Sequence, residues 1–440
     1  MTLMVRSERL IIFGRYPVPG RTKTRLIPFL GAARAADFQR ELTEKTLKTD
    51  RSLAQRRSLD LEFCVEGGSA AKLRRWLGPD LIVSEQSSGD LGERMKGAFL
   101  EAFRQGAQRV VLHGTDIPGL TTQHVDKAFD ALKSHGLVLG PSTDGGYWLI
   151  GLTKPAALFD SMEWGTSSVF DKTVAGARRQ GLSVHVLSPL TDMDTAEAVR
   201  QWMPQWASRQ PYLSVIIPAL NEGAHIEETV LKARSPDAEI IVVDGRSGDR
   251  TVDRAERSGA MVLRGPRGRA VQQNRGAAAA RGTILLFLHA DTLLPQDYVT
   301  HVFETLMDRK IILGAFRFRT DLDRPLMKGI EFVTNFRAGS LRLPYGDQGI
   351  FLRKHHFLAA GGFPEMPIAE DLFFVRFMSR KGRIAIAPAY AITSGRRWKE
   401  AGLLRTTLIN QLIVAGVALG ISPEALAGLY RRAAKKKGKS

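Results

Sequence analysis

Runs of apolar residues alternate with amphipathic stretches along the chain, and this order of elements occurs twice. In the first half, the pattern predicts strands at 9–14, 59–65, 109–113, 137–140 and 183–187, and helices near 32–57, 91–105, 122–134 and 168–180. The second half starts again with predicted strands at 213–218, 239–244 and 261–263, and helices near 223–233, 249–258 and 270–281. Such alternation is typical of βαβ units. We therefore predict an α/β protein with two tandem domains built on mostly parallel sheets.

The segment between the two halves, from Trp202 to Tyr212, lacks a clean periodicity and contains two prolines. We place the domain boundary in this segment, which predicts domains at 1–208 and 209–440. A chain of 440 residues is too long for one ordinary hydrophobic core and suits two domains of about 200 residues each.

Two of the predicted strands end in an acidic residue, one in each half. The apolar run at 283–288 is followed by His-Ala-Asp291, and the run at 109–112 is followed by His-Gly-Thr-Asp116. In open α/β sheets, ligands bind outside the carboxyl ends of the strands. We therefore expect Asp116 and Asp291 to lie in two related sites that handle nucleotides or phosphates.

Composition places the chain among folded proteins of a reducing compartment. Hydrophobic residues make up 44% and charged residues 25% of the chain, as in ordinary globular domains. The single cysteine, Cys64, excludes an intramolecular disulfide. The chain runs from Met1 almost directly into a predicted strand, without the pattern of a secretory signal. We therefore expect a cytoplasmic protein.

The charge balance favours an anionic partner. Lys and Arg number 63 and Asp and Glu number 45, which gives a net charge of +18. Nucleotide phosphates or an acidic membrane surface would match this charge, and basic residues spread over solvated faces would explain it equally well. The sequence has neither a zinc-finger spacing nor an aromatic and basic sheet signature, so we expect no nucleic acid partner.

The carboxyl end carries a different pattern, because residues 403–421 are mostly apolar. Arg405, Asn410 and Gln411 interrupt this stretch, and the uninterrupted part is too short to span a bilayer. We expect a helix that packs on the core or lies at a membrane surface. Six basic residues follow at 431–439, either as a solubilising tail or as a further peripheral contact with the inner face of the membrane.

Three acidic signals in the second half suit an enzyme that binds a nucleotide. Asp244 ends a predicted strand and precedes a polar turn that leads into a helix, where an acid can accept hydrogen bonds from a base or ribose. Asp291 is a candidate ligand for a hard divalent ion. Glu370 and Asp371 precede a helix predicted over 372–380. Taken singly, Asp244 is equally consistent with an ordinary turn and Glu370-Asp371 with a helix cap.

In this order, the signals resemble the family 2 glycosyltransferases of the GT-A fold over nearly all of residues 212–440. The resemblance is carried by Pro218-Ala-Leu-Asn221-Glu222, Val242-Val-Asp244-Gly245, His289-Ala-Asp291 and Glu370-Asp371. It implies a Rossmann-like nucleotide-diphospho-sugar transferase fold, a nucleotide-sugar donor, and inversion of the anomeric centre with Asp371 as general base beside Glu370. It further implies a metal on Asp291 and nucleotide contacts at Pro218, Asn221, Glu222, Asp244 and Gly245.

A narrower resemblance links the second half to a subgroup associated with radical-SAM and arsenosugar biosynthesis genes. It rests on the segments 268–282, 287–292, 344–349 and 396–398. The chain departs from the family pattern twice, because His289 replaces the first aspartate of the metal motif and the segment after Gly245 lacks the usual second glycine and threonine. The resemblance implies a nucleotide contact at Asn274 and diphosphate or acceptor contacts at Asp347, Gln348, Arg397 and Trp398.

The opening loop of the first half suits a phosphate cradle. A predicted strand runs into a loop with Gly, Pro, Lys23 and Arg25, whose cations and backbone N–H groups match phosphate oxygens. The glycine, lysine and hydroxyl spacing of a P-loop is absent. Asp116 and Asp194 are candidate metal ligands. Asp144-Gly145 permits a close backbone approach to a ligand, and on its own is equally consistent with a turn.

Together with Asp90 and Arg94, these segments resemble the DUF2064 family, also called the radical-SAM/selenodomain-associated transferase 1 group, across about residues 9–205. That group is similar to the molybdenum-cofactor and phospholactate guanylyltransferases, which share the nucleotide-diphospho-sugar transferase fold. The resemblance leaves nucleotidyl transfer and glycosyl transfer both open for this half. It implies nucleotide contacts at Lys23, Arg25, Asp90, Arg94, Asp144 and Gly145.

We therefore predict a bifunctional protein whose second half transfers a sugar from a nucleotide-sugar to an acceptor hydroxyl with Mg²⁺ or Mn²⁺. The acceptor is expected to be a small molecule or a lipid-linked molecule. The first half is predicted to be a nucleotide-binding transferase, and a hypothesis is that it makes the activated donor that the second half uses. Two alternatives stay open: a protein that is chiefly a nucleotidyltransferase with an accessory second domain, and a non-catalytic, membrane-docked sensor of nucleotide-sugars.

Overall fold

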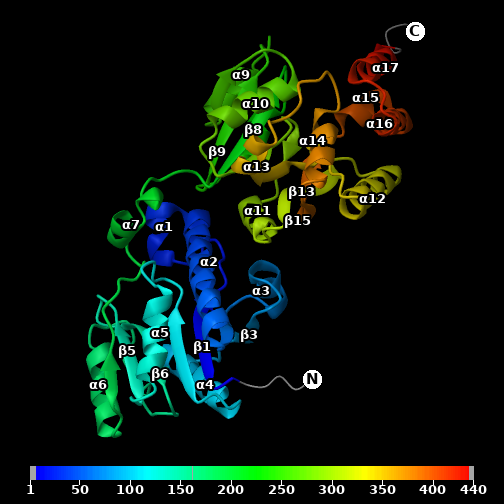
Figure 1. Ribbon diagram of the computed structural model, residues 1–440. Helices are drawn as coiled ribbons and strands as arrows, with labels where there is room; N and C mark the ends of the chain where they lie inside the picture. The colour runs from blue at the N-terminus through cyan, green and yellow to red at the C-terminus, as the bar shows by residue number, and fades with distance from the viewer. Residues whose placement is uncertain (1–5, 161, 436–440) are drawn as a thin grey trace. The chain divides into compact units, whose positions relative to one another are not determined.

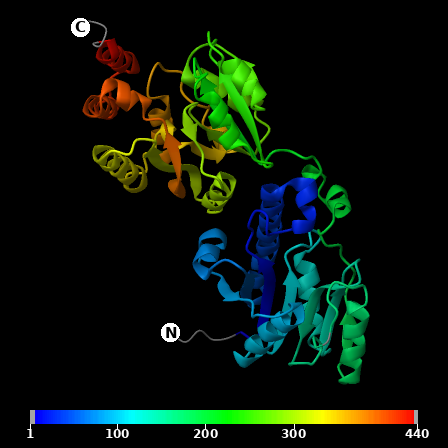
Figure 2. The ribbon, with the colours of Figure 1, turned by 180° about the vertical axis from the view of Figure 1, so that it is seen from behind.

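The computed structural model describes residues 6–160 and 162–435, and the chain divides into two compact units, Met1–Arg209 and Gln210–Ser440 (Figures 1 and 2). Each unit contains one sheet with helices packed on both of its faces. Parallel pairs outnumber antiparallel pairs in both sheets, so the predicted α/β class is confirmed.

The first sheet is formed by β1 Glu8–Arg15, β2 Asp60–Glu66, β3 Ile82–Glu85, β4 Arg109–Gly114, β5 Leu137–Pro141, β6 Tyr147–Leu152 and β7 Val184–Val186. Its strand order is β3-β2-β1-β4-β6-β5-β7. The first four strands in this order are parallel, β6 is antiparallel to both of its neighbours, and β7 is parallel to β5. The central strands β1 and β4 are continuous apolar runs, because helices cover both faces of the sheet.

The helical elements of the first domain are η1 Thr24–Leu26, α1 Ile27–Leu30, α2 Ala32–Arg57, α3 Ala70–Leu77, α4 Leu91–Arg104, α5 Thr122–Ala131, α6 Val169–Arg179, α7 Ala196–Trp202 and η2 Pro204–Trp206. Successive residues of β1 point to opposite faces of the sheet. Ile11 therefore packs with residues of α4 and α6, while Leu10 packs with residues of α2 and α5. These two apolar layers fix the sheet whose carboxyl edge carries the predicted site.

The second sheet is formed by β8 Leu213–Ala219, β9 Ala238–Asp244, β10 Met261–Arg264, β11 Ile284–Phe287, β12 Thr292–Leu293, β13 Ile311–Thr320, β14 Ile350–Arg353 and β15 Arg383–Thr393. Its strand order is β10-β9-β8-β11-β14-β13-β15-β12. Strand β14 is antiparallel to both β11 and β13, and β15 is parallel to β13. Apart from the short edge strand β12, this is the arrangement of the first sheet repeated strand for strand.

The helical elements of the second domain are α8 Ile226–Ala233, α9 Thr251–Arg257, α10 Arg269–Ala279, α11 Tyr298–Leu306, α12 Pro325–Ser340, η3 Gly346–Gln348, α13 Lys354–Ala359, α14 Glu370–Ser379, α15 Arg396–Ala401, α16 Leu403–Ala418 and α17 Pro423–Lys435. Its main core joins β8, β9, β11 and β14 to α10 and α14 through residues such as Ile216, Val243 and Phe374. The helix α14 is thereby fixed beside the carboxyl end of β11.

The apolar stretch predicted at 403–421 forms α16 and stops where Gly420 adopts a left-handed backbone (φ 77°). None of the helices within residues 6–160 and 162–435 combines the length and the apolar character needed to cross a bilayer.

Candidate active sites of the two domains

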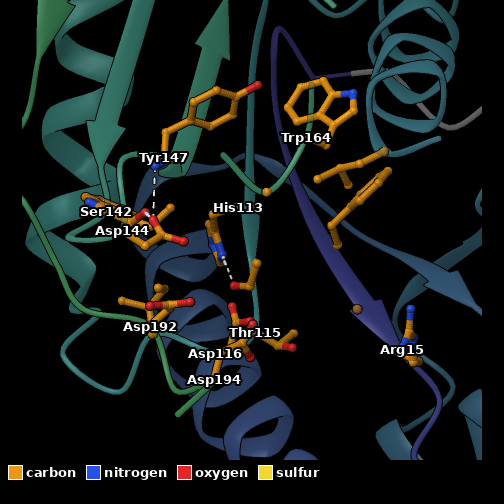
Figure 3. Close-up of a pocket in the computed structure, with 18 of the residues that line it drawn as sticks. Arg15, His113, Thr115, Asp116, Ser142, Asp144, Tyr147, Trp164, Asp192 and Asp194 are labelled. Carbon is orange, nitrogen blue, oxygen red and sulfur yellow. Dashed lines mark hydrogen bonds between the residues drawn. The ribbon is translucent and has the colours of Figure 1, made fainter. Parts of the chain in front are cut away.

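A cavity of about 530 Å³ lies at the carboxyl ends of β1 and β4 in the first domain (Figure 3). Its walls come from the loop after β1, the start of α4, the segment after β4 and the β5–β6 connection. Figure 3 shows the acidic side chains near Asp116 at one end, and the rings of Tyr147 and Trp164, 6.4 Å apart, at the other. This is where open α/β sheets bind ligands. The predicted residues that line the cavity are Lys23, Arg25, Arg94, Asp116, Asp144 and Asp194.

Lys23 lies between the two aspartates predicted as metal ligands. Its Nζ is 3.2 Å from Asp116 Oδ2 and 2.6 Å from Asp194 Oδ1. Asp116 follows β4, Asp194 lies between β7 and α7, and Lys23 enters the η1 turn with a left-handed backbone (φ 49°). Burial disfavours the charge of Lys23, but the two carboxylates outweigh burial and raise its pKa. Two carboxylates far apart in the sequence therefore converge on one point.

Asp192 adds another acid to this end of the cavity. Its pKa is raised to about 6, first by burial and then by the charges of Asp194, Asp144 and Asp116. Lys23 opposes the shift. The carboxylates at this end outnumber the cations that act on Asp192, which is the electrostatic setting in which a hard cation is favoured. Asp192 lies two residues before Asp194 in the sequence, but only the folded structure shows that it is half-buried in the wall of the cavity.

The opposite wall of the cavity carries guanidinium groups. Arg15 and Arg94 both pair with Glu66, at 2.7 Å and 3.0 Å. Arg94 also donates to Gln86 Oε1 at 3.0 Å, and the amide of Gln86 donates to the carbonyl of Gly14. These bonds hold two fixed cations beside the end of β1, where they are suited to phosphate oxygens.

Two residues predicted to contact the nucleotide are occupied by the fold itself. Asp90 begins α4 and forms a capping box with Glu93, in which each side chain accepts from the other's backbone N–H at 2.9 Å. Gly145 has φ 92°, and a side chain there would collide with the backbone of Ser167. The close backbone approach at Gly145 is thus made to another loop, and the predicted nucleotide contacts at both positions stay predictions.

A fully buried contact between a histidine and an aspartate at the cavity has no counterpart in the predicted motifs. His113 Nε2 lies 3.3 Å from Asp50 Oδ2, and both side chains are inaccessible to solvent. The other ring nitrogen, Nδ1, is 2.8 Å from the carbonyl of Gly114. Burial opposes the charged form of His113, but Asp50 outweighs it and raises the pKa of the imidazole. This pair ties α2 to the end of β4, just before Asp116.

In the second domain, hydrogen bonds link the two loops that follow β8 and β9. The buried carboxylate of Asp244 accepts from the backbone N–H groups of residues 246 and 247, at 3.0 Å and 3.1 Å. Asn221, with φ 56°, accepts from the N–H of Gly248 at 2.9 Å. The N–H of Gly245 donates to the carbonyl of Ala219. These predicted nucleotide-binding residues therefore shape the loop pair at the edge of the sheet.

Arg396 connects the first loop to the strand-end aspartate. Its Nη2 lies 3.2 Å from Glu222 Oε1 and 3.9 Å from Asp291 Oδ2. Arg396 begins α15, directly after the end of β15. The sequence prediction chose the adjacent Arg397, whose side chain lies outside the described residues. Arg396 is thus the cation that the structure places among the predicted nucleotide and metal residues.

The candidate general base lies beside the altered metal motif. Asp371 Oδ2 accepts a hydrogen bond of 2.7 Å from the backbone N–H of Gly346. A Cβ atom built on Gly346 would lie 2.9 Å from both Asp371 Oδ2 and His289 Nε2. Both side chains therefore approach the same point, and the absence of a side chain at residue 346 leaves room for them. Asp371 is half-buried, so its carboxylate is accessible to a ligand.

Glu370 differs from its neighbour in burial. Its side chain is buried and pairs with Arg269 at 3.4 Å. Burial raises the pKa of Glu370, Arg269 opposes the shift, and the charge of Asp371 reinforces it. The backbone of Ala369 is left-handed (φ 64°), which starts α14 abruptly and turns the two acids to different sides. Of the predicted acid pair, Asp371 is the more accessible to solvent.

The remaining predicted residues of the second domain take part in packing or strand pairing. The buried amide of Gln348 donates to the carbonyl of Phe316 and accepts from the N–H of Tyr345. Asn274 forms two hydrogen bonds with the backbone of Phe363, and Trp398 packs in a cluster with Phe318, Leu322 and Met327. Pro218 pairs with Val243 in the sheet. The backbone carbonyl of Asp347 accepts a hydrogen bond from the hydroxyl of Thr393. Their predicted ligand contacts stay predictions.

Arg337 is a further cation that the sequence prediction missed. It lies on α12, its guanidinium stacks 3.4 Å from the ring centroid of Tyr345, and its Nε donates to the carbonyl of Leu343. Burial lowers its pKa, while Tyr345, Asp347 and Asp371 favour its charge. Apolar residues around it on α12 gave no sequence signal for this role. Arg337 supports the loop that carries Gly346.

Within the described ranges, no three His, Cys, Asp or Glu side chains converge on one point. Mg²⁺ is commonly bound by one or two carboxylates together with substrate phosphates. Asp116 and Asp194 fit this pattern, because both carboxylates reach Lys23 Nζ. Asp291 offers one carboxylate, and Arg396 lies 3.9 Å from it. A metal bound to Asp291 and the guanidinium of Arg396 would therefore both contact the diphosphate.

Comparisons with known families agree with the two-domain geometry. The family described as an uncharacterized protein conserved in bacteria (DUF2064) matches residues 46–166, and glycosyl transferase family 2 matches residues 214–362. The predicted fusion of these two domains is confirmed. The chain is also 30% identical over 152 residues to a phosphoenolpyruvate guanylyltransferase of Chloroflexus aggregans, a match that covers 31% of this chain and 74% of the relative.

Solved structures that are similar to parts of the chain include the following three. A protein of Desulfovibrio desulfuricans, provisionally assigned as a nucleotide-diphospho-sugar transferase, is 36% identical with a TM-score of 0.42, over 46% of this chain and 88% of its own. A mannosyltransferase of Pyrobaculum calidifontis in complex with GDP-Man and Mn²⁺ is 21% identical with a TM-score of 0.38, over 47% and 63%. A glucosyl-3-phosphoglycerate synthase of Mycobacterium tuberculosis with Mn²⁺ and UDP is 21% identical with a TM-score of 0.35, over 47% and 77%.

Proposed function

The chain belongs to DUF2064 through its first domain and to glycosyl transferase family 2 through its second, and we propose that it is a bifunctional transferase. The family 2 domain and the relationship to a guanylyltransferase support a glycosyl or nucleotidyl transferase. In the proposal, the second domain transfers a sugar from a nucleotide-sugar to an acceptor hydroxyl. The first domain transfers a nucleotidyl group and so makes an activated compound.

The proposal of glycosyl transfer rests on the approach of Asp371 and His289 to one point beside Gly346. His289 lies two residues before Asp291 in the sequence. Asp371 is accessible and receives the Gly346 N–H, whereas Glu370 is buried against Arg269. In this arrangement Asp371 takes the proton of the acceptor hydroxyl while the oxygen attacks the anomeric carbon. Attack from the face opposite the departing diphosphate inverts that carbon.

The diphosphate that departs needs positive charge. Arg396 supplies a guanidinium between Glu222 and Asp291, and Asp291 would hold Mg²⁺ or Mn²⁺ together with phosphate oxygens. When bound, such an ion neutralises charge on the departing diphosphate. The loops joined by Asn221 and Asp244 form the adjoining edge, where a base and ribose would lie.

Support for nucleotidyl transfer in the first domain comes from the charges in its cavity. Arg15 and Arg94 lie along one wall, and Asp116 and Asp194 converge at the opposite end. Such a site can bind a triphosphate at the cations and a divalent ion at the carboxylates. The identity with a curated guanylyltransferase favours the same reaction class.

The test uses the full chain and separates the two activities. Nucleoside diphosphate release from a panel of nucleotide-sugars reports on the second domain, and pyrophosphate release from nucleoside triphosphates reports on the first. Asp371→Asn should lower nucleoside diphosphate release by roughly 10²–10⁴-fold, since general-base catalysis contributes that much, and should leave pyrophosphate release unchanged. Asp116→Asn should lower pyrophosphate release and leave nucleoside diphosphate release unchanged. Asp253→Asn, at an exposed ion pair on α9, is the control for both.

Donor binding provides the second measurement. A nucleotide-sugar at 100 times its dissociation constant should stabilise the protein by about 2.7 kcal/mol, and Asp371→Asn should retain this shift. A variant that binds the donor but has lost turnover supports the base role. Full turnover by Asp371→Asn would eliminate that role. Donor binding with no turnover even by the wild type would favour the alternative of a nucleotide-sugar sensor.

A further inference from the structure

The helix α12 is apolar on two opposite faces. Its inner face places Met327 and Ala338 against the domain and directs Asn335 to the backbone of Phe318. Its outer face exposes the side chains of Leu326, Phe332, Val333 and Phe336, with Phe332 71% and Phe336 60% accessible. A helix on the surface of a soluble domain normally presents polar residues outward. The outer face of α12 therefore lacks a partner within the described part of the chain.

The helix α16 is a neighbour of α12. It contacts the α12 cluster through Leu403, and it exposes Leu408 and Leu412 one turn apart. Figures 1 and 2 show α12 and α16 at the same margin of the second domain, on the side away from α9 and α10. We call this surface the α12–α16 face. Exposed apolar patches of this kind mark interaction sites more often than single exposed leucines do.

The charges around the α12–α16 face are mostly basic. Arg324, Lys328 and Arg342 are exposed at its rim. Lys328 pairs with Asp323 at 2.9 Å, whereas Glu331 turns inward and accepts from Thr320. The α16 helix carries Arg405 as its one charged residue. An apolar centre with a basic rim matches the interface of an anionic bilayer, where aromatic and aliphatic side chains enter the acyl boundary and cations meet headgroups.

The face is also connected to the site of the second domain. Arg337, on the inner side of α12, stacks on Tyr345, and the adjacent Gly346 donates its N–H to Asp371. A surface that seats α12 at a bilayer would therefore hold the loop of the candidate base close to the headgroups. The sequence prediction of peripheral contact concerned 403–421 and the basic tail, and α12 was no part of it.

We propose that the α12–α16 face docks on an anionic lipid bilayer without spanning it. Docking depends on the exposed apolar side chains and the basic rim, and it is independent of whether the second domain transfers a sugar. The measurement is flotation of the full chain with phosphatidylcholine vesicles that do or do not contain phosphatidylglycerol. The wild type should float with the anionic vesicles and be released by salt, because the basic rim is screened.

The deciding variant is Phe332→Ser/Phe336→Ser, which removes two exposed rings and leaves the inner face unchanged. It should weaken vesicle binding at least about tenfold, because each ring contributes apolar area to insertion. Leu231→Ser/Met261→Ser, which removes exposed apolar side chains from α8 and β10, is the matched control and should bind as the wild type does. Equal melting temperatures of the two variants would exclude unfolding as the cause.

Three results would overturn the proposal. The wild type could fail to bind anionic vesicles, or Phe332→Ser/Phe336→Ser could bind as well as the wild type. Light scattering could also show a dimer that this double variant loses, with no vesicle binding, which would make a second copy of the chain the occupant of the face. Charge removal from the tail by Lys435→Gln/Lys436→Gln/Lys437→Gln separates the tail from the face. If the tail variant lost all vesicle binding while Phe332→Ser/Phe336→Ser bound fully, docking would be assigned to the tail.

Discussion

The two domains order their strands identically, as β3-β2-β1-β4-β6-β5-β7 in the first and β10-β9-β8-β11-β14-β13-β15 in the second. The equivalent strands β4 and β11 are each followed by an aspartate, Asp116 and Asp291. Both aspartates lie near a cation, Lys23 in the first domain and Arg396 in the second. The cations, however, come from different places in the fold.

In the first domain the loop after the first strand supplies Lys23, and the segment after the last strand supplies Asp194. In the second domain the corresponding loop supplies the acid, Glu222, and the segment after the last strand supplies the cation, Arg396. Two of three equivalent positions have thus exchanged the sign of their charge. The fold fixes where three ionic groups meet, while the sequence decides which of them is positive.

This exchange has a chemical consequence. If Lys23 moves toward a phosphate, Asp116 and Asp194 remain as two carboxylates for a divalent ion. If Arg396 moves, Glu222 and Asp291 remain, but the two lie 3.2 Å and 3.9 Å from the arginine, whereas Asp116 and Asp194 lie 3.2 Å and 2.6 Å from Lys23. We therefore expect the first domain to depend more strongly on Mg²⁺ or Mn²⁺ than the second.

The largest effect should come from glycines at the equivalent connection between the fifth and sixth strands. A Cβ at Gly346 would lie 2.9 Å from Asp371 Oδ2 and His289 Nε2, whereas a Cβ at Gly146 would lie 3.3 Å from Asp144 Oδ1. Gly346→Ala should lower sugar transfer by roughly 100-fold, because displacing a catalytic group by about 1 Å has that effect. Gly146→Ala should change nucleotidyl transfer only a few-fold.

Initial rates of both reactions in both variants measure the difference. Gly339→Ala, at an open position of α12, controls for the added methyl group. Equal rates for Gly346→Ala and the wild type would show that Asp371 and His289 do not need their present positions.

The next effect concerns Lys23. Lys23→Met removes the cation that Asp116 and Asp194 share, although Arg25 still lies 3.8 Å from Asp194, and it should destabilise the first domain by about 2 kcal/mol without divalent ions. This is less than for a fully buried pair, because both carboxylates are partly exposed to solvent. Added Mn²⁺ should restore the stability, since it would replace the missing charge.

Urea unfolding of the full chain with and without Mn²⁺ measures this effect. Lys96→Met removes an exposed ion pair with Asp160 and serves as the control that Mn²⁺ should not rescue. A Lys23→Met protein that Mn²⁺ stabilises no more than the wild type would show that the two aspartates are not a metal site.

Arg396→Gln should have a smaller effect on stability than Lys23→Met, and it should mainly lower the affinity for the donor. The arginine is partly exposed, so the free energy of unfolding should change by less than about 1 kcal/mol. The affinity for a nucleotide-sugar should fall about tenfold, because a charged hydrogen-bond donor to the diphosphate is lost. Calorimetric titration measures the affinity, and Arg250→Gln, at an exposed pair with Asp253, is the control. Unchanged donor affinity in Arg396→Gln would leave Arg396 with only a structural role.

The sequence was informative where parallel strands are buried on both faces. Such strands are continuous apolar runs, so their ends, and with them Asp116, Asp244 and Asp291, could be predicted. Between residues 294 and 349 the pattern failed. Strand β13 changes from a nearly continuous buried run to alternation near its end, and α12 is apolar on both faces, so neither keeps one period over its whole length. The fold in this region depends on tertiary packing that periodicity does not record.

Individual roles within the sites were less predictable than the motifs. Lys23 was expected to bind phosphate, but its pairing with Asp116 and Asp194 depends on three segments meeting in space. The sequence predicted a contact at Arg397, and the structure additionally places its neighbour Arg396 beside Glu222, which the sequence alone did not indicate. Burial likewise separates Glu370 from Asp371, although the two acids are adjacent. Sequence patterns predicted candidate residues at strand ends, and packing decides which contacts these residues make in the structure.

The smallest expected effect is a pH dependence that only the first domain should show. The pKa of Asp192 is raised to about 6 by burial and by neighbouring carboxylates, whereas the same side chain in the unfolded chain titrates near 3.9. The folded state therefore holds a proton that the unfolded state loses between about pH 4 and pH 6, and stability contributed by Asp192 falls as the pH rises through this window.

Asp192→Asn removes that loss of stability. The free energy of unfolding of Asp192→Asn relative to the wild type, measured by urea unfolding without Mn²⁺, should thus increase from pH 4 to pH 7. The control variant Asp171→Asn, at an exposed position of α6, should show no such trend. A difference between Asp192→Asn and wild type that is constant across this range would mean that Asp192 ionises as easily in the cavity as in water, and that the acidic end of the first site is not crowded.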